Sequence, residues 1–267
     1  MDPMQILLLA LVQGLTEFLP ISSSGHLILA PHLFGFADQG LVLDVAVHFG
    51  TLIAVVGYFR RDIWQIARNW STALPPGRPA NPEARLAWAI IIGVLPVVVV
   101  GLLLKDFVES ELRQAWIIAA TTIVFGLLLG WADWRARRER DITRLNLRDA
   151  LLIGLAQVLA LVPGTSRSGI TMTAGLMLGF TREAAARFSF LLSIPTILGS
   201  SILILRDVLT TPETVDPAIL ASAVGLSTLT AWACIHYFLA FIERIGMWPF
   251  VIYRLLLGVV ILLVLAG

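Results

Sequence analysis

The chain contains one unusual pattern twice: an apolar run that is broken by a short polar segment and then resumes. The two copies span residues 13–26 and 157–170, an offset of 144 residues between positions 13 and 157. In a protein embedded in lipid, paired interrupted segments at matching positions indicate a ligand site near the middle of the membrane. Identical residues at this offset are Gln13 and Gln157, Ser22 and Ser166, Ser24 and Ser168, Gly25 and Gly169, Gly35 and Gly179, and Phe36 and Phe180.

The composition indicates that the chain lies in a membrane. Of its 267 residues, 58% are hydrophobic and 14% are charged, whereas soluble domains carry about 25% charged residues. The net charge of +1 says little about partners, and no nucleic-acid partner is expected. A single cysteine, Cys234, excludes an internal disulfide and a cysteine-based zinc site. The first residues lack the basic region and cleavage pattern of a signal peptide, so none is expected.

Apolar segments divide into two kinds by length. Two stretches, 1–35 and 148–181, each hold two apolar pieces that are short for full crossings, so we expect helix-turn-helix segments that enter the membrane and return. The predicted fold is an all-α integral membrane protein with six transmembrane helices and two re-entrant segments. The six spans, each of about 20 residues, are 41–60, 86–104, 115–134, 184–206, 217–242 and 247–266.

Arginine placement predicts the orientation. Two basic segments, one from Arg60 to Arg85 and one from Arg135 to Arg148, are expected in the cytoplasm. The acidic stretches 105–113 and 207–216 are then outside, and the proline-rich residues 75–82 form a loose linker. The two re-entrant segments would enter from opposite faces and meet near the midplane as an inverted-topology repeat. We predict a single membrane domain over residues 1–267, with repeats at about 1–134 and 148–267.

The first interruption places a carboxylate beside hydroxyl groups. Gln13 and Glu17 are four residues apart and share one helix face. A carboxylate is costly in lipid and usually faces a cavity or a partner, although neighbouring hydroxyls alone could satisfy Glu17 as a structural group. After Pro20, Ser22 or Ser23 is expected to cap a helix over residues 24–34. Ser24 adds a third hydroxyl, and His26, in the first turn of that helix, is either a structural or a chemical residue.

The second interruption predicts an anion site. The planar guanidinium of Arg167 suits phosphate, and the helix that begins there directs free N–H groups at an anion. The alternative is an arginine that only pairs with Glu17 across the repeat interface. Ser166, Ser168 and Thr171 add hydroxyl donors, and Gly164 lets the backbone approach the anion closely.

Together the residues of the two interruptions predict a nucleophilic attack at phosphorus, on a substrate that is anchored in lipid. Arg167 and the helix N–H groups would hold the charge of the phosphoryl oxygens. His26 or Glu17 would move a proton.

At these residues the chain resembles the bacterial undecaprenyl-diphosphate phosphatase family, also called the bacitracin-resistance protein family. The family signatures (E/Q)-x-x-x-E and P-G-x-S-R-S-x-x-T correspond here to residues 13–17 and 163–171. The intervening residues 18–26 match too, and the resemblance extends along the whole chain to segments such as residues 248–254. Many family members have glutamate where this chain has Gln13, which leaves Glu17 as the single carboxylate ligand.

The resemblance implies an enzyme of the bacterial inner membrane that removes the terminal phosphate of undecaprenyl diphosphate. Its product carries peptidoglycan precursors, and excess enzyme is associated with bacitracin resistance. The resemblance also implies a divalent cation, Mg²⁺ or Ca²⁺, on Glu17 and a cavity open to the periplasm. By motif the catalytic set is Glu17, Ser23, His26 and Arg167. The residues expected around the diphosphate are Gln13, Ser22, Ser24, Gly164, Thr165, Ser166, Ser168 and Thr171. The partners would be the lipid substrate and bilayer lipids, with a homodimer left open.

Two other functions are compatible with the pattern. Inverted repeats are also a transporter trait, so a transporter or flippase for an anionic polyprenyl-phosphate headgroup is the main alternative. A structural scaffold leaves Glu17 and Arg167 without a purpose. Outside the two interruptions, Asp44 and His48 suit either the cavity mouth or a structural pair. Arg254, in the last span, either reaches the surface or has an interior partner.

Overall fold

The computed structural model describes residues 3–35, 40–73, 81–210 and 216–265. These residues form helices joined by turns and short loops, and an isolated bridge pairs Arg140 with Phe180. Two single 3₁₀ turns, η1 (Ile142–Arg144) and η2 (Leu159–Leu161), flank α7. The helices are α1 (Pro3–Thr16), α2 (Ser23–Phe34), α3 (Gly40–Tyr58), α4 (Arg60–Ala73), α5 (Pro82–Glu111), α6 (Ala115–Arg135), α7 (Leu147–Val158), α8 (Arg167–Met177), α9 (Arg182–Thr210), α10 (Pro217–Ile245) and α11 (Trp248–Leu265).

The predicted class, an all-α membrane protein, is confirmed. Four helices, α5, α6, α9 and α10, are long and apolar enough to cross a membrane, and the bent pair α3–α4 makes a fifth candidate. The apolar helix α11 is shorter over Trp248–Val264. The exact count of six spans therefore stays a prediction.

The segment expected as a basic loop after the first span is largely helical. Helix α4 follows α3 directly, and the two axes are bent by 72°. Ile63, Ile66 and Trp70 recur at helical spacing and pack against the core, while Trp64 is exposed. An amphipathic helix of this kind suits a membrane surface. Parts of three expected features lie outside the described residues: most of the linker 75–82, the residue Phe36 of the repeat pair Phe36 and Phe180, and part of the outer stretch 207–216.

Helix starts are determined locally. Asn146 and Asp149 form a reciprocal capping box at α7, and Asn81 and Asp216 cap α5 and α10, each followed by proline at the first helical position.

Arginine ion pairs also join the helices: Arg182 binds Asp133 and Arg140 binds Asp149. Arg187 lies 2.8 Å from Asp62 and 3.9 Å from Glu183.

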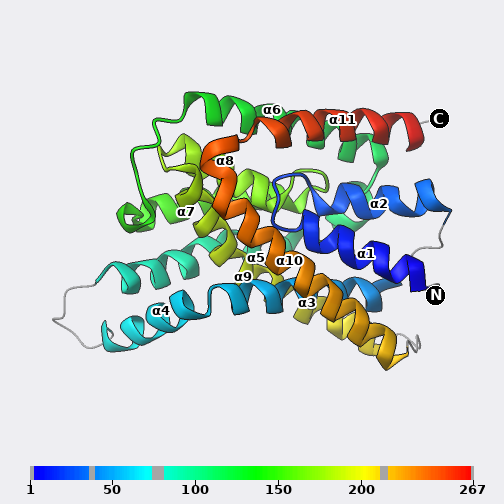
Figure 1. The fold of residues 1–267 in the computed structure, drawn as a ribbon, viewed down its shortest axis with the longest axis horizontal. Coiled ribbons are helices and arrows are strands. Elements are labelled where there is room, and N and C mark those ends of the chain that lie inside the picture. The colour runs from blue at the N-terminus through cyan, green and yellow to red at the C-terminus, as the bar shows by residue number, and fades with distance from the viewer. Residues whose placement is uncertain (1–2, 36–39, 74–80, 211–215, 266–267) are drawn as a thin grey trace.

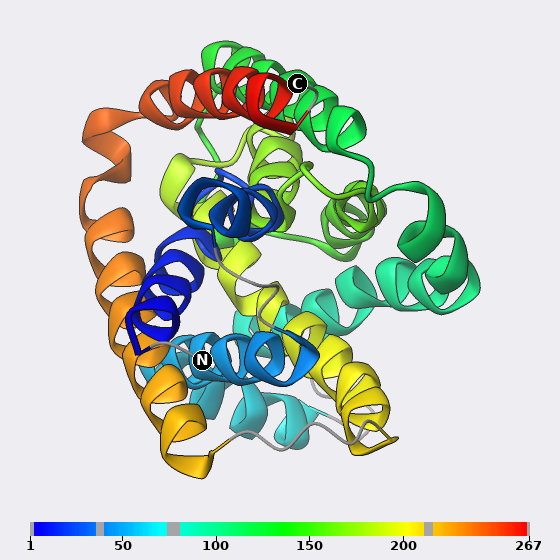
Figure 2. The same ribbon diagram turned by 90° about the vertical axis from the view of Figure 1, so that its right-hand side faces the viewer.

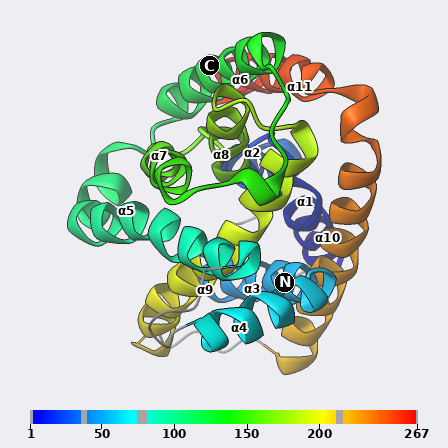
Figure 3. The same cartoon turned by 90° about the vertical axis from the view of Figure 1, so that its left-hand side faces the viewer.

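The interrupted segments are two short helical hairpins. Helices α1 and α2 have 14 and 12 residues, and α7 and α8 have 12 and 11, which is too few to cross a bilayer. In Figure 1 the α1–α2 hairpin extends from the side of the two termini, and α7–α8 approaches from the other side. The end views show longer helices around the hairpins, with α6 and α11 side by side along one edge (Figures 2 and 3). Re-entry from opposite membrane faces, and the division into two repeats, stay predictions.

Candidate active site

The two hairpin turns have the same local construction. Ser22 and Ser166 both adopt positive φ values, 74° and 70°, which is uncommon for a residue with a side chain. Each hydroxyl accepts the N–H of the glycine three residues later, at 3.4 Å from Gly25 and 3.1 Å from Gly169. Ser22, rather than Ser23, is therefore the N-cap of α2. Strain of this kind is typical of functional sites, and here it recurs at the sequence offset of the repeat.

Serines at equivalent positions join the two turns. The Ser24 hydroxyl accepts the N–H of Gly164 at 3.1 Å. Reciprocally, the Ser168 hydroxyl donates to the carbonyl of Leu19 at 2.9 Å. These bonds hold the hairpin tips in contact, as the repeat predicted.

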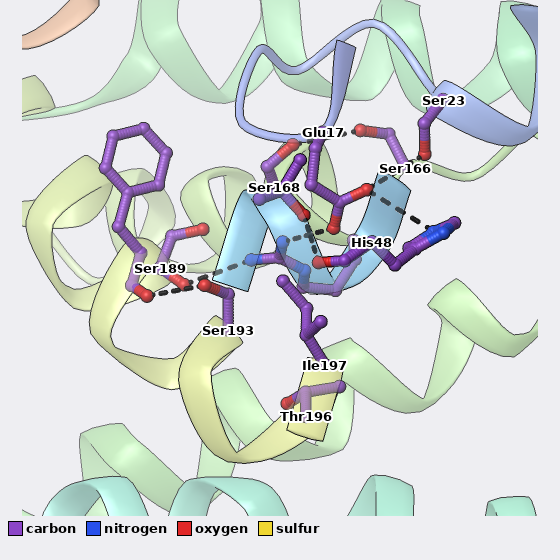
Figure 4. A network of polar contacts seen from close by, with 12 residues as sticks. Glu17, Ser23, His48, Ser166, Ser168, Ser189, Ser193, Thr196 and Ile197 are labelled. Carbon is purple, nitrogen blue, oxygen red and sulfur yellow. Dashed lines mark hydrogen bonds and ion pairs between the residues drawn. The ribbon is translucent and has the colours of Figure 1, made fainter. Parts of the chain in front are cut away.

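The contact brings the acidic and basic residues together. Arg167 Nη2 donates to Glu17 Oε1 at 2.9 Å, and the two side chains are only 13% and 9% exposed. Arg167 Nη1 donates to the carbonyl of Ser189 in α9 at 3.2 Å. Figure 4 shows Glu17 between Ser23 and His48, in a group of polar side chains from α2, α3, α8 and α9. A mostly buried guanidinium–carboxylate pair thus lies where the two turns meet.

The second oxygen of Glu17 receives two hydrogen bonds. Gln13 Nε2 donates to Oε2 at 2.9 Å, and the Ser23 hydroxyl donates to the same oxygen at 3.3 Å. Gln13 is fully buried, and its Oε1 has no hydrogen-bond partner. The carboxylate therefore lies beside both a candidate nucleophile and an unused oxygen ligand.

The two nearby histidines occupy different surroundings. His26 Nδ1 donates to the Ser22 carbonyl at 2.7 Å, and its Nε2 lies 2.6 Å from the Tyr253 hydroxyl. His48 Nδ1 donates to the Asp44 carbonyl at 2.7 Å, and its Nε2 lies 3.9 Å from Glu17 Oε2. The imidazole nearest to Glu17 is therefore His48. Sequence reasoning left His48 either at the cavity mouth or in a structural pair with Asp44, because one histidine in an apolar span does not reveal where α3 packs.

Other residues expected around the diphosphate mainly support the turns. The Thr171 hydroxyl lies 2.7 Å from the Ser189 hydroxyl, and Thr165 Oγ1 is buried without a partner. Gly164 packs so closely on α6 that an added Cβ would lie 2.4 Å from the carbonyl of Ile118. Ser23, Ser24, Ser166 and Arg167 retain partial exposure. Direct contact of this wider set with a diphosphate stays a prediction.

A divalent cation at this site would need ligands from the substrate as well as from the protein. Within residues 3–35, 40–73, 81–210 and 216–265, no group of three or more His, Cys, Asp or Glu residues surrounds a common point. Mg²⁺ commonly binds through one or two carboxylates plus the phosphates of a substrate. Glu17 and the unpaired Oε1 of Gln13 supply such a partial set.

Known proteins resemble this chain along nearly its whole length. The family model described as bacitracin resistance protein BacA matches residues 6–260. A Nitrosococcus oceani protein named undecaprenyl-diphosphatase is 57% identical over 258 residues, which is 97% of each chain. One with the same name from Chromohalobacter salexigens is 56% identical over 98% of each chain. Undecaprenyl-diphosphatase 2 of Stutzerimonas stutzeri is 54% identical over the full length of both chains.

Proposed function

The chain belongs to the bacitracin resistance protein BacA family, and we infer from this membership that it hydrolyses undecaprenyl diphosphate to undecaprenyl phosphate and inorganic phosphate. The relatives named undecaprenyl-diphosphatase cover nearly the whole chain. The observation that carries the reaction to particular residues is the Arg167–Glu17 contact at 2.9 Å, with Ser23 at 3.3 Å from the same carboxylate. The reaction regenerates the lipid carrier for cell-wall synthesis.

Binding begins with an exchange of partners at Arg167. The terminal phosphate competes with Glu17 for the guanidinium, whose planar donors match two phosphate oxygens. The first N–H groups of α8 add dipole stabilisation to the same anion. Once Arg167 turns to phosphate, Glu17 keeps its hydrogen bonds from Ser23 and Gln13.

Ser23 then serves as the nucleophile. Its hydroxyl donates to Glu17, and a hydroxyl beside a proton acceptor is an activated pair. The Ser23 hydroxyl passes its proton to Glu17 as its oxygen forms a bond to the terminal phosphorus. The bond from phosphorus to the bridging oxygen breaks, and undecaprenyl phosphate leaves with that oxygen. Water next hydrolyses the phosphoserine to inorganic phosphate and restores the hydroxyl. Direct attack by water that Ser23 positions is the alternative route.

Two imidazoles, those of His26 and His48, are available for proton transfer. We assign proton transfer to the substrate to His26, which lies one turn from Ser23 and is oriented by the Ser22 carbonyl and the Tyr253 hydroxyl. His48 lies beside Glu17, so it is placed to share a proton with that carboxylate.

A divalent cation, Mg²⁺ or Ca²⁺, would be held by Glu17 and Gln13 together with the diphosphate. When bound, it neutralises charge on the phosphate oxygens.

The site belongs to a protein that we place in the bacterial inner membrane, with its cavity open to the periplasm. The support is the arginine distribution, which directs the α1–α2 hairpin, and Glu17 with it, to the outer side. The formation of a homodimer stays an open question.

Transport of a polyprenyl-phosphate headgroup is not favoured, and one assay separates the two functions. Purified protein in detergent has no compartments, so a transporter without enzymatic activity releases no phosphate from farnesyl diphosphate. We expect release by the wild type and a loss of several orders of magnitude in Glu17→Ala. No release by folded, cation-supplied wild type would refute the hydrolase.

A further inference from the structure

Arg254 is a cation in the interior of the protein whose charge the mechanism above does not use. Its side chain is fully buried in α11. No carboxylate among the described residues forms an ion pair with it. A buried charge without a counter-ion is expensive, so its retention calls for a physical reason.

The guanidinium reaches both hairpin turns through backbone carbonyls. Nη2 donates to Gly164 at 2.9 Å and to Thr165 at 3.0 Å in the second turn. Nη1 lies 3.4 Å from the carbonyl of Pro20 in the first turn. Positions 20 and 164 are separated by the repeat offset, so one side chain binds equivalent carbonyls of both repeats.

The same side chain fastens the turns to the surrounding frame. Arg254 Nε donates to the carbonyl of Thr122 in α6 at 3.0 Å, and the Thr122 hydroxyl itself donates to the Gly164 carbonyl at 3.3 Å. The guanidinium also packs against the first turn of α8, because a Cβ added at Gly169 would lie 2.8 Å from Nη1. Arg254 thus contacts the first turn of α8, the helix that begins with Arg167.

We propose that Arg254 is a positioning residue, which locks the two turns in the register that aligns Arg167, Glu17 and Ser23 for phosphoryl transfer. Glu17 and Ser23 flank the first turn, and Arg167 directly follows the second turn. A displacement of one turn relative to the other would therefore change the positions of Glu17 and Ser23 relative to Arg167. The carbonyl groups that accept hydrogen bonds from Arg254 lie in different directions, on α6 and on both turns. The planar guanidinium of arginine can donate to all of them, whereas the single ammonium group of lysine is poorly suited to do so. The proposal rests on the hydrolase function and deepens it.

The test compares Arg254→Lys, which keeps the charge, with Arg254→Gln. As a control, Arg182→Lys alters another largely buried arginine, which pairs with Asp133 outside the site. Phosphate release from farnesyl diphosphate yields kcat and KM per monodisperse protein. The inhibition constant of inorganic phosphate reports anion binding separately, and thermal unfolding reports the fold.

A misplacement of about 1 Å costs about 100-fold in rate, so we expect Arg254→Lys to lose about that factor in kcat. Its KM and phosphate inhibition constant should stay near the wild-type values, because Arg167 itself is unchanged. Arg254→Gln should lose at least as much kcat, and Arg182→Lys should retain it.

Three results would overturn the proposal. Wild-type kcat in Arg254→Lys would mean that charge alone matters. Equal weakening of phosphate inhibition and kcat would indicate anion binding instead of alignment. Failure of both Arg254 variants to fold, with Arg182→Lys folded, would make the residue purely structural. Inactive wild-type protein would instead count against the hydrolase function.

Discussion

Replacing Arg167 tests the central electrostatic argument, because its charge is mostly desolvated. The side chain is 13% exposed and lies 2.9 Å from Glu17. At about 4 Å from a developing phosphoryl charge and an effective dielectric constant of about 20, Coulomb's law gives about 4 kcal/mol. Since each 1.36 kcal/mol is about tenfold in rate, Arg167→Gln should lower kcat/KM about 1,000-fold. Arg167→Lys keeps the charge but loses a charged hydrogen bond of about 1.5–3 kcal/mol, about 10- to 100-fold.

The assay is phosphate release from farnesyl diphosphate by purified variants, with thermal unfolding as the check on folding. Arg187→Gln is the matched control. It removes a guanidinium that pairs with Asp62 at 2.8 Å, where both side chains are about one-third exposed, so activity should persist. If folded Arg167→Gln stayed within tenfold of wild type, or if the lysine and glutamine variants were equally active, the charge argument would be wrong.

Four further changes have defined outcomes. Ser23→Ala should abolish both turnover and the phosphoprotein seen in rapid-quench labelling; persistent turnover without labelling would favour direct attack by water. His48→Ala should lower kcat about 100-fold because its imidazole adjoins Glu17, and an unchanged rate would remove it from the site. A chelator should suppress phosphate release until Mg²⁺ or Ca²⁺ is restored, and full activity in the chelator would exclude the cation. Gly164→Ala should lower the unfolding temperature, because φ is +90° and the new Cβ would meet Thr121 Oγ1 at 2.2 Å; an unchanged midpoint would contradict this close packing.

The helix class followed from the sequence, because hydrophobic length and interruption are properties of local stretches. The α1–α2 and α7–α8 hairpins were predictable since each apolar piece is too short to span lipid. The helical conformation of α4 was missed, because its arginines suggested a loop, whereas Ile63, Ile66 and Trp70 stabilise an amphipathic helix against the core.

The sequence also determined which residues are chemically notable. A carboxylate and a guanidinium in otherwise apolar runs are costly unless they meet a partner, and the repeat offset suggested that Glu17 and Arg167 would meet. The resemblance to the bacitracin-resistance family was confirmed by the match over residues 6–260.

Only the tertiary structure decided which residues share the site. His48 adjoins Glu17, and Arg254 has interior partners in both turns. These contacts join residues far apart in the chain, and they depend on how α3, α6 and α11 pack around the hairpins. Spacing along one helix reports which side chains share a face, but it carries no information about which distant backbone carbonyl that face will meet.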